Sequence, residues 1–390
     1  MIKFHSIILA FVFLLSEFIY ASETHVRVRI LKSFQPIIVS AHQLTINNMA
    51  LHSSLLKQAK WKIERQKKDN KWQWKLKDLK SNNELWFSQD EITINGDFLE
   101  LNYNIHLPSG LKLYAKKQRI DVVSILNLEE YLMGVVPNEM PAAWPEEALK
   151  AQAIASRSYT MSVINERQHL HFDLEASVED QVFNWVPKNE SLTRWHQKVK
   201  TIISETKGKI LSHNGVGIYK AYFHADSGGQ TELAKFVWGE DNNDPSSSVH
   251  SAYVNSPNQF WNRQWPIEQV ASWLNNSESK TLKDLKVLSR SPSGRVKQLE
   301  IVWEDKTQVI SGQEFRKKIG YSRLKSTWFN VSKKGLFYSF NGRGFGHGVG
   351  MCQWGARFLA LQGKDFTEIL KHYYPQTILK EISLEKIAFK

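Results

Sequence analysis

Length and composition set the first limits on this chain. Its 390 residues are 42% apolar and 23% charged, as in ordinary globular proteins, which excludes wholesale disorder and a collagen-like repeat and predicts two or three domains. A single cysteine excludes a disulfide framework and a cysteine-based zinc or iron–sulfur site, and the net charge of +12 favours an anionic partner.

Residues 1–21 are predicted to be a secretory signal peptide. Lys3 and His5 precede a short apolar run, Ile7 to Leu15, and the small residue Ala21 ends the segment. The run is shorter than the roughly 20 apolar residues that span a bilayer, although an uncleaved anchor is the alternative. We therefore expect an exported protein of the periplasm or cell envelope, with no stable membrane span.

Residues 22–119 are predicted to form an N-terminal β-rich region. Val26 and Val28 belong to a run that alternates with arginines, which is the period of a half-buried strand. Asp69-Asn70 predicts a turn that brings the run around Trp74 back onto the strand before it, and Asn95-Gly96 predicts a two-residue hairpin. The pattern indicates an antiparallel sheet or small barrel with a basic outer face.

The pattern changes near residue 120, where helices begin. Asn127 is placed to cap a short helix that Gly134 would end, and Pro145 opens a longer helix that reaches Ile164. Strands return after Gly208. We predict an α+β fold for 120–384, treated as one domain: mainly antiparallel strands with one long helix packed on the sheet.

Glu139 is the first candidate for chemistry. It lies between Pro137 and Pro141 in an apolar stretch, and because Pro141 disfavours helix at Met140, the sequence predicts an ordered loop between the two helices. A carboxyl group among apolar neighbours stays protonated more readily, as a general acid must. The alternative is an ordinary solvated glutamate.

The segment 341–354 is unusual because every second residue from 342 to 350 is glycine. In an extended strand, one face would be bare backbone and the other would present Arg343, Phe345, His347 and Val349. The glycine spacing matches neither a phosphate loop nor a dinucleotide fingerprint. A close-packed crossing of strands and a ligand-binding strand both fit this pattern.

Two further groups are weighed as alternatives. Cys352 follows His347 by five residues, which raises a cysteine–histidine nucleophile pair, with a buried inert thiol as the other interpretation. His169 and His171 lie close to acidic residues, but a structural zinc site needs about four ligands and no cysteine is nearby. We predict no metal and no other cofactor.

Several motifs, in the same order along the chain, resemble the stage II sporulation protein D (SpoIID) / LytB family over roughly 121–377. They are Leu128-Glu129-Glu130-Tyr131-Leu132, Glu139-Met140-Pro141, Ala151-Gln152-Ala153 with Ala155-Ser156-Arg157-Ser158-Tyr159, Ser227-Gly228-Gly229, Val237-Trp238-Gly239, and Gly346-His347-Gly348 with Gln353-Trp354-Gly355.

This resemblance implies an action on peptidoglycan. Enzymatic members are lytic transglycosylases, which cut MurNAc–GlcNAc bonds in peptide-free (denuded) glycan strands and leave 1,6-anhydro-MurNAc ends; others are described as enhancers of a cell-wall amidase. The family's catalytic glutamate matches Glu139. Two departures stand out: 174–185 lacks the cysteines with which some members hold zinc, and Cys352 stands where serine is common.

Candidate substrate-binding residues are named from the charge of the implied substrate and from their place around the predicted cleft. Arg157, Arg343 and His347 are predicted to recognise the lactyl carboxylates that stem-peptide removal exposes, and Ser227, Gly228, Gly229 and Gln353 to line the cleft. Gln152 and Tyr159 are placed beside it, although Gln152, Arg157 and Tyr159 also suit a purely structural role that joins the long helix to the sheet. Glycan strands are the expected partner, a cell-wall amidase is a candidate second partner, and a non-catalytic activator of that amidase is the alternative function. Nucleic acid is not expected.

Overall fold

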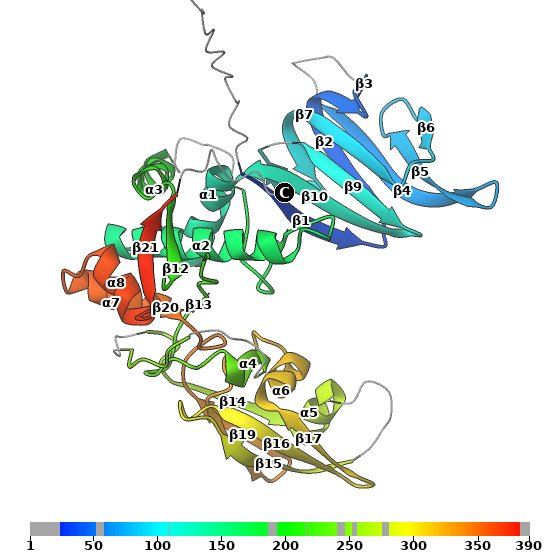
Figure 1. Cartoon of the computed structure of the whole chain (residues 1–390). Helices are drawn as coiled ribbons and strands as arrows, with labels where there is room; N and C mark the ends of the chain where they lie inside the picture. The colour runs from blue at the N-terminus through cyan, green and yellow to red at the C-terminus, as the bar shows by residue number, and fades with distance from the viewer. Residues whose placement is uncertain are drawn as a thin grey trace, which may run out of the picture.

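The computed structural model describes residues 24–51, 58–108, 110–185, 193–215, 217–239, 246–251, 256–274 and 281–382. The predicted signal peptide, 1–21, lies outside these residues. Figure 1 shows three parts: a large N-terminal sheet, a layer of helices, and a second β lobe reached through the short strands β13 (Phe223–His224) and β20 (Met351–Cys352). Within the described residues, every helix is too short or too polar to cross a membrane.

The N-terminal part is an eleven-stranded sheet within the described residues, in the order β11-β1-β10-β9-β7-β2-β4-β5-β6, with β3 on β2 and β8 on β7. Except for β11 on β1, its strands pair antiparallel, as expected. The bounds are β1 His25–Ser33, β2 Ile37–Ile46, β3 Met49–Ala50, β4 Ala59–Lys68, β5 Lys71–Asp78, β6 Glu84–Phe87, β7 Glu91–Leu101, β8 Ile105–Leu107, β9 Leu111–Lys116, β10 Arg119–Asn127 and β11 Leu174–Glu175.

One of the two predicted turns in this sheet is confirmed and the other is wrong. Asp69 and Asn70 have positive φ and join β4 to β5. Asn95 and Gly96, in contrast, lie inside β7, where the pairing with β2 shifts register. A Cβ on Gly96 would stand 2.6 Å from the Cβ of Ala41, so this glycine permits close strand packing rather than a reversal of the chain.

The helical layer corrects the expectation of one long helix packed on the sheet. The helix α2 (Glu146–Glu166) covers the predicted 145–164 segment, but it is one of several helices and packs mainly against them and against β12, because its buried residues occur on nearly every side. The other elements of this layer are α1 Leu128–Glu139, α3 Thr193–Glu205, α7 Gln353–Leu361, α8 Phe366–Tyr373, β12 Lys209–His213 and β21 Thr377–Glu381.

The second β lobe has a hydrophobic core of its own, built around Phe315, Phe329 and Phe340. The region predicted as a single domain, 120–384, therefore contains two cores, and its first strand, β10, belongs to the N-terminal sheet. The lobe consists of α4 Lys235–Trp238, β14 Trp261–Pro266, α5 Ile267–Leu274, β15 Leu282–Arg290, β16 Val296–Trp303, β17 Thr307–Ser311, α6 Gly312–Ile319, β18 Phe329–Lys334 and β19 Phe337–Gly342.

Candidate active site

Glu139 is the last residue of α1, not part of a loop as the sequence predicts. Asn127 caps the helix as expected, but Gly134 does not end it. A Cβ at Gly134 would stand 2.4 Å from the ring of Phe183, so the glycine is needed for close packing inside the helix. The side-chain amide of Asn138 donates to the carbonyls of Gly134 and Asn184, which fixes the last helical turn against the following segment.

The carboxyl group of Glu139 accepts two hydrogen bonds from neutral donors. The backbone N–H of Val182 donates to Oε1 at 2.8 Å, and the side-chain amide of Gln353 donates to Oε2 at 3.1 Å. Burial raises the pKa of Glu139 above its usual 4.5, and the two hydrogen bonds only partly oppose this rise. Glu139 is therefore easier to keep protonated than an exposed glutamate.

Two predicted binding residues support Glu139: Gln353 contacts its carboxyl, and Gln152 contacts Gln353. Gln353 opens α7, and its amide nitrogen lies 3.1 Å from Glu139 and 3.4 Å from Oε1 of Gln152. The Gln152 amide in turn donates to Ser156 Oγ. Gln152 is fully buried and Gln353 nearly so; Gln152 on α2 therefore positions Gln353 on α7, whose amide orients the carboxyl at the end of α1.

Arg157 and Tyr159 occupy structural positions. Arg157 is fully buried and forms a two-pronged ion pair with Glu129, at 2.8 and 2.7 Å, and it also donates to the carbonyl of Lys209. Tyr159 donates its hydroxyl to Asp180, and burial raises the pKa of this phenol well above its usual range. Asp180 precedes Val182 by two residues, so Tyr159 helps to hold the segment that binds Glu139.

The Ser227–Gly229 turn lies against α7 and the glycine-rich segment. The N–H of Ser227 donates to the sulfur of Cys352, the N–H of Gly228 donates to Asp226, and Arg295 donates to the carbonyl of Ser227 at 2.6 Å. All three turn residues are buried. Since Gln353 follows Cys352, these contacts connect the turn to the residue that binds Glu139.

The glycine-rich segment is not the extended strand that the alternation predicts. After β19 ends at Gly342, the glycines at 344, 346, 348 and 350 have φ of +76°, +115°, +91° and +70°. A Cβ on Gly344 would meet the backbone of 226–228 at 2.7–3.0 Å. The segment is thus a close-packed crossing whose Phe345 and Val349 form single β-bridges with Asp226 and Glu232, earlier in the same chain.

His347 lies in an aromatic cluster and is neutral at physiological pH. Its Nδ1 accepts the N–H of Val349, and burial lowers its pKa to about 3. The centre of its ring lies 5.2 Å from the ring centre of Trp238. Trp238 is 45% exposed and stacks on Tyr222, with 4.3 Å between the ring centres. Neither Trp238 nor Tyr222 is among the predicted site residues, although Trp238 belongs to the Val237-Trp238-Gly239 motif.

Arg343 is partly buried in the second lobe and lies over two aromatic rings. Its guanidinium lies 4.6 Å from the ring centre of Trp328 and 5.6 Å from that of Phe260, which is strongly exposed. Arginine stacked on aromatic rings in this way can still donate hydrogen bonds at its edge. Recognition of a carboxylate by Arg343 stays a prediction.

The two alternative groups give no reactive arrangement. Cys352 caps α7, accepts the N–H groups of Ser227 and Gly355, and has its pKa raised by burial, which opposes thiolate formation. His171 lies 3.0 Å from Asp121, but within the described residues no three histidine, cysteine or acidic side chains are grouped as metal ligands.

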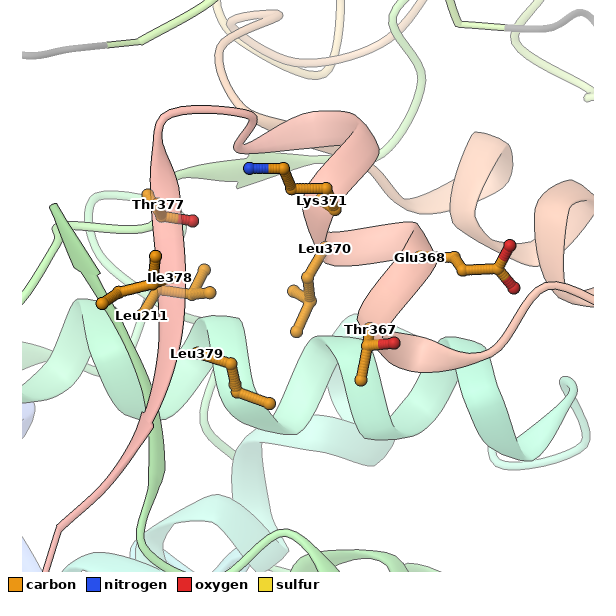
Figure 2. A pocket seen from close by; sticks show the side chains of 8 residues that line it. All are labelled: Leu211, Thr367, Glu368, Leu370, Lys371, Thr377, Ile378 and Leu379. Carbon is orange, nitrogen blue, oxygen red and sulfur yellow. The ribbon is translucent and has the colours of Figure 1, made fainter. Parts of the chain in front are cut away.

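A separate apolar groove, of about 570 Å³, lies between α8 and β21 (Figure 2). Leu370 and Leu379 point into it, and Glu368 points away. Its remaining lining residues are Leu211, Thr367, Lys371, Thr377 and Ile378. None of the predicted site residues lines it, so the groove is not part of the Glu139 site.

The chain is similar to a known family and to several known proteins. The family model "SpoIID: Stage II sporulation protein" matches 116–213, and a domain of unknown function, DUF8618, matches 248–350, which is most of the second lobe. An uncharacterised protein of Brachyspira hyodysenteriae is 33% identical over 74% of this chain and 73% of its own length. Stage II sporulation protein D of Bacillus subtilis is 32% identical over 66% of this chain and 76% of its own length.

A third relative is named differently. The amidase enhancer of Bacillus subtilis is 28% identical over 64% of this chain, and the match covers 40% of that relative's length. All three matches are long, and the named relatives indicate a cell-wall role.

Proposed function

The chain belongs to the SpoIID family of stage II sporulation proteins, and we propose that it is an exported peptidoglycan lytic transglycosylase acting on peptide-free glycan strands. The observation that carries this proposal is the carboxyl of Glu139, which is partly buried, accepts hydrogen bonds from two neutral donors and has a raised pKa. These are the properties of a general acid that is protonated when the substrate binds.

In the proposed mechanism one carboxyl group acts twice. Glu139 first gives its proton to the glycosidic oxygen, so that the bond from C1 of MurNAc to that oxygen breaks and GlcNAc leaves with a hydroxyl. The carboxylate then removes the proton of the muramyl C6 hydroxyl, whose oxygen bonds to C1. The product is a 1,6-anhydro ring, and no water is consumed.

The internal hydroxyl explains why one acidic residue suffices. Ordinary glycosidases use two carboxyl groups, one as acid and one as nucleophile or base. Here the C6 hydroxyl replaces the second group. Val182 and Gln353 stabilise the carboxylate that exists between the two steps, since both donate to its oxygens.

Substrate binding is proposed to combine stacking with charge. Trp238, stacked on Tyr222 and partly exposed, offers a flat face for a sugar ring. Among the predicted recognition residues, His347 is neutral and Arg157 is paired with Glu129, so we assign recognition of the carboxylate to Arg343. We assign His347 to the aromatic cluster and Arg157 to the scaffold.

Glu139→Gln tests the proposal directly. The change keeps the shape of the side chain but removes the proton donor, so release of anhydro-muramyl products from denuded strands should fall about 10²- to 10⁴-fold. Mass spectrometry of the products measures this loss. Cys352→Ser is the matched control and should retain activity; equal rates for Glu139→Gln and wild type would contradict the mechanism.

The second candidate function is a non-catalytic activator of a cell-wall amidase. It is favoured by one relative, whose name is amidase enhancer. Purified protein incubated with denuded strands and no amidase separates the two proposals. New anhydro ends support the transglycosylase; their absence, together with amidase activation that survives Glu139→Gln, supports the activator.

A further inference from the structure

The hairpin formed by β4 and β5 holds half of the chain's excess positive charge. Residues 59–80 contain nine lysines and arginines against three aspartates and glutamates, a surplus of 6 out of the total of +12. This hairpin lies at the end of the sheet that is farthest from α7 and α8 in Figure 1. The concentration of charge is therefore separate from the Glu139 site.

Six lysines of the hairpin share one face of the sheet. The opposite face is buried and contains Trp61, Ile63, Trp74 and Leu76. Because side chains alternate along a strand, the remaining positions point outward. We call this surface the lysine face; it comprises Lys60, Lys62, Lys68, Lys71, Lys75 and Lys77.

Two pairs on this face place lysines directly opposite each other. Lys62 is in register with Lys77, and Lys68 with Lys71. Like charges directly across two strands destabilise a sheet, so local stability does not explain these residues. Protection of a sheet edge does not explain Lys62, Lys75 or Lys77, because β2 pairs with 59–63 of β4 and β6 pairs with 74–77 of β5.

The lysine face also carries an aromatic ring and spare cations. Trp86 on β6 lies 4.9 Å from Nζ of Lys68 and 5.5 Å from Nζ of Lys75, measured to the ring centre. Glu64 and Glu84 pair with Lys62 and Lys75. Among the described residues no carboxylate lies within ion-pair distance of Lys68, Lys71 or Lys77.

We propose that the lysine face is a second, non-catalytic docking site for the peptide-free glycan strand; the identity of this occupant rests on the proposed function. Lactyl carboxylates along such a strand complement the unpaired lysines, and sugar rings can pack beside Trp86. A ten-residue strand spans about 33 Å, which accommodates several sugars. A strand held here raises the effective concentration of its own bonds at the Glu139 site.

The test uses the mature full-length protein with Glu139→Gln, so that binding is measured without cleavage. Lys68→Glu with Lys71→Glu changes the charge of the face by four. Lys333→Glu with Lys334→Glu, on the exposed β18, makes the same change elsewhere. Calorimetry with denuded strands, with strands whose carboxylates are amidated, and with single-stranded DNA gives three dissociation constants for each protein.

We expect the Lys68/Lys71 variant to bind long denuded strands at least about 10-fold more weakly, the β18 variant to bind as the parent does, and amidated strands to bind weakly to all three. In the catalytically intact background, cleavage of long strands should slow and cleavage of short fragments should not. Equal binding by both charge variants overturns the docking site, and so does DNA that binds more tightly than denuded strands at the same salt concentration.

Failure of this inference is distinguishable from failure of the proposed function. If the lysine variants bind normally while Glu139→Gln abolishes anhydro products, only the docking site is wrong. If the lysine variants lose binding while wild type releases no anhydro ends, the docking site stands and the transglycosylase proposal fails.

Discussion

The two ends of α1 each carry a partly buried glutamate, and the groups that hold the two carboxylates differ. Glu129 lies in the first turn, where the helix dipole favours a negative charge, and it forms a two-pronged ion pair with Arg157. Glu139 lies in the last turn, where the dipole disfavours a negative charge, and its donors are neutral amides.

This contrast separates a structural carboxylate from one suited to proton transfer. Glu129 accepts two hydrogen bonds from the guanidinium of Arg157, which also donates to the carbonyl of Lys209. Glu139 lies where burial and the helix dipole both favour the protonated form, while two hydrogen bonds make the anion accessible when needed. One helix thus contributes an anchor at its start and a candidate acid at its end.

Arg157→Leu should produce the largest effect on stability. It leaves Glu129 without its partner, and removal of one member of a buried pair typically costs about 3–5 kcal/mol. Chemical denaturation measures this loss in the free energy of unfolding. Glu129→Leu combined with Arg157→Leu should recover most of it. An Arg157→Leu protein that stays stable but shows a much higher KM would instead assign Arg157 to substrate binding.

Glu139→Gln should have the opposite, pH-dependent effect on stability. The folded pKa of Glu139 lies above its usual 4.5, so the stability that its protonated form contributes is fully present below that value and is lost as pH rises through the folded pKa. Toward neutral pH, the free energy of unfolding of the variant should therefore increase relative to wild type, by about 1.4 kcal/mol for each unit by which the folded pKa is raised.

Thermal denaturation of Glu139→Gln and wild type across pH 4 to 8 measures this difference. Glu129→Gln is the matched control, because it removes an ion pair and should be destabilised at neutral pH. A Glu139→Gln protein that loses stability relative to wild type as pH rises would show that Glu139 is held as an anion, like Glu129.

Gln353→Leu should have the smallest effect of the three changes, and it tests how the neutral donors set the pKa of Glu139. It removes one hydrogen bond that lowers the pKa of Glu139, so that pKa should rise further. The alkaline limb of the rate profile should then move to higher pH, with less than about a 10-fold change in the maximal rate. An unchanged limb would mean that Gln353 does not set the proton affinity.

The sequence allowed the α+β class, the antiparallel N-terminal sheet and the extent of α2 to be predicted, because period and capping are local signals. Three predictions at glycines are wrong: a turn at Gly96, a helix end at Gly134 and an extended strand over 344–350. In each place glycine permits close contact with a distant segment. Local sequence patterns carry no information about that distant segment.

The sequence by itself determined the family, the identity of Glu139 as the candidate acid and the basic character of the N-terminal sheet, since motifs and charge are written along the chain. Only the tertiary structure decided which polar residues face Glu139. It brings Val182 and Gln353 to the carboxyl, buries Arg157 against Glu129 and leaves His347 uncharged, because proton affinity depends on burial and on partners far away in sequence.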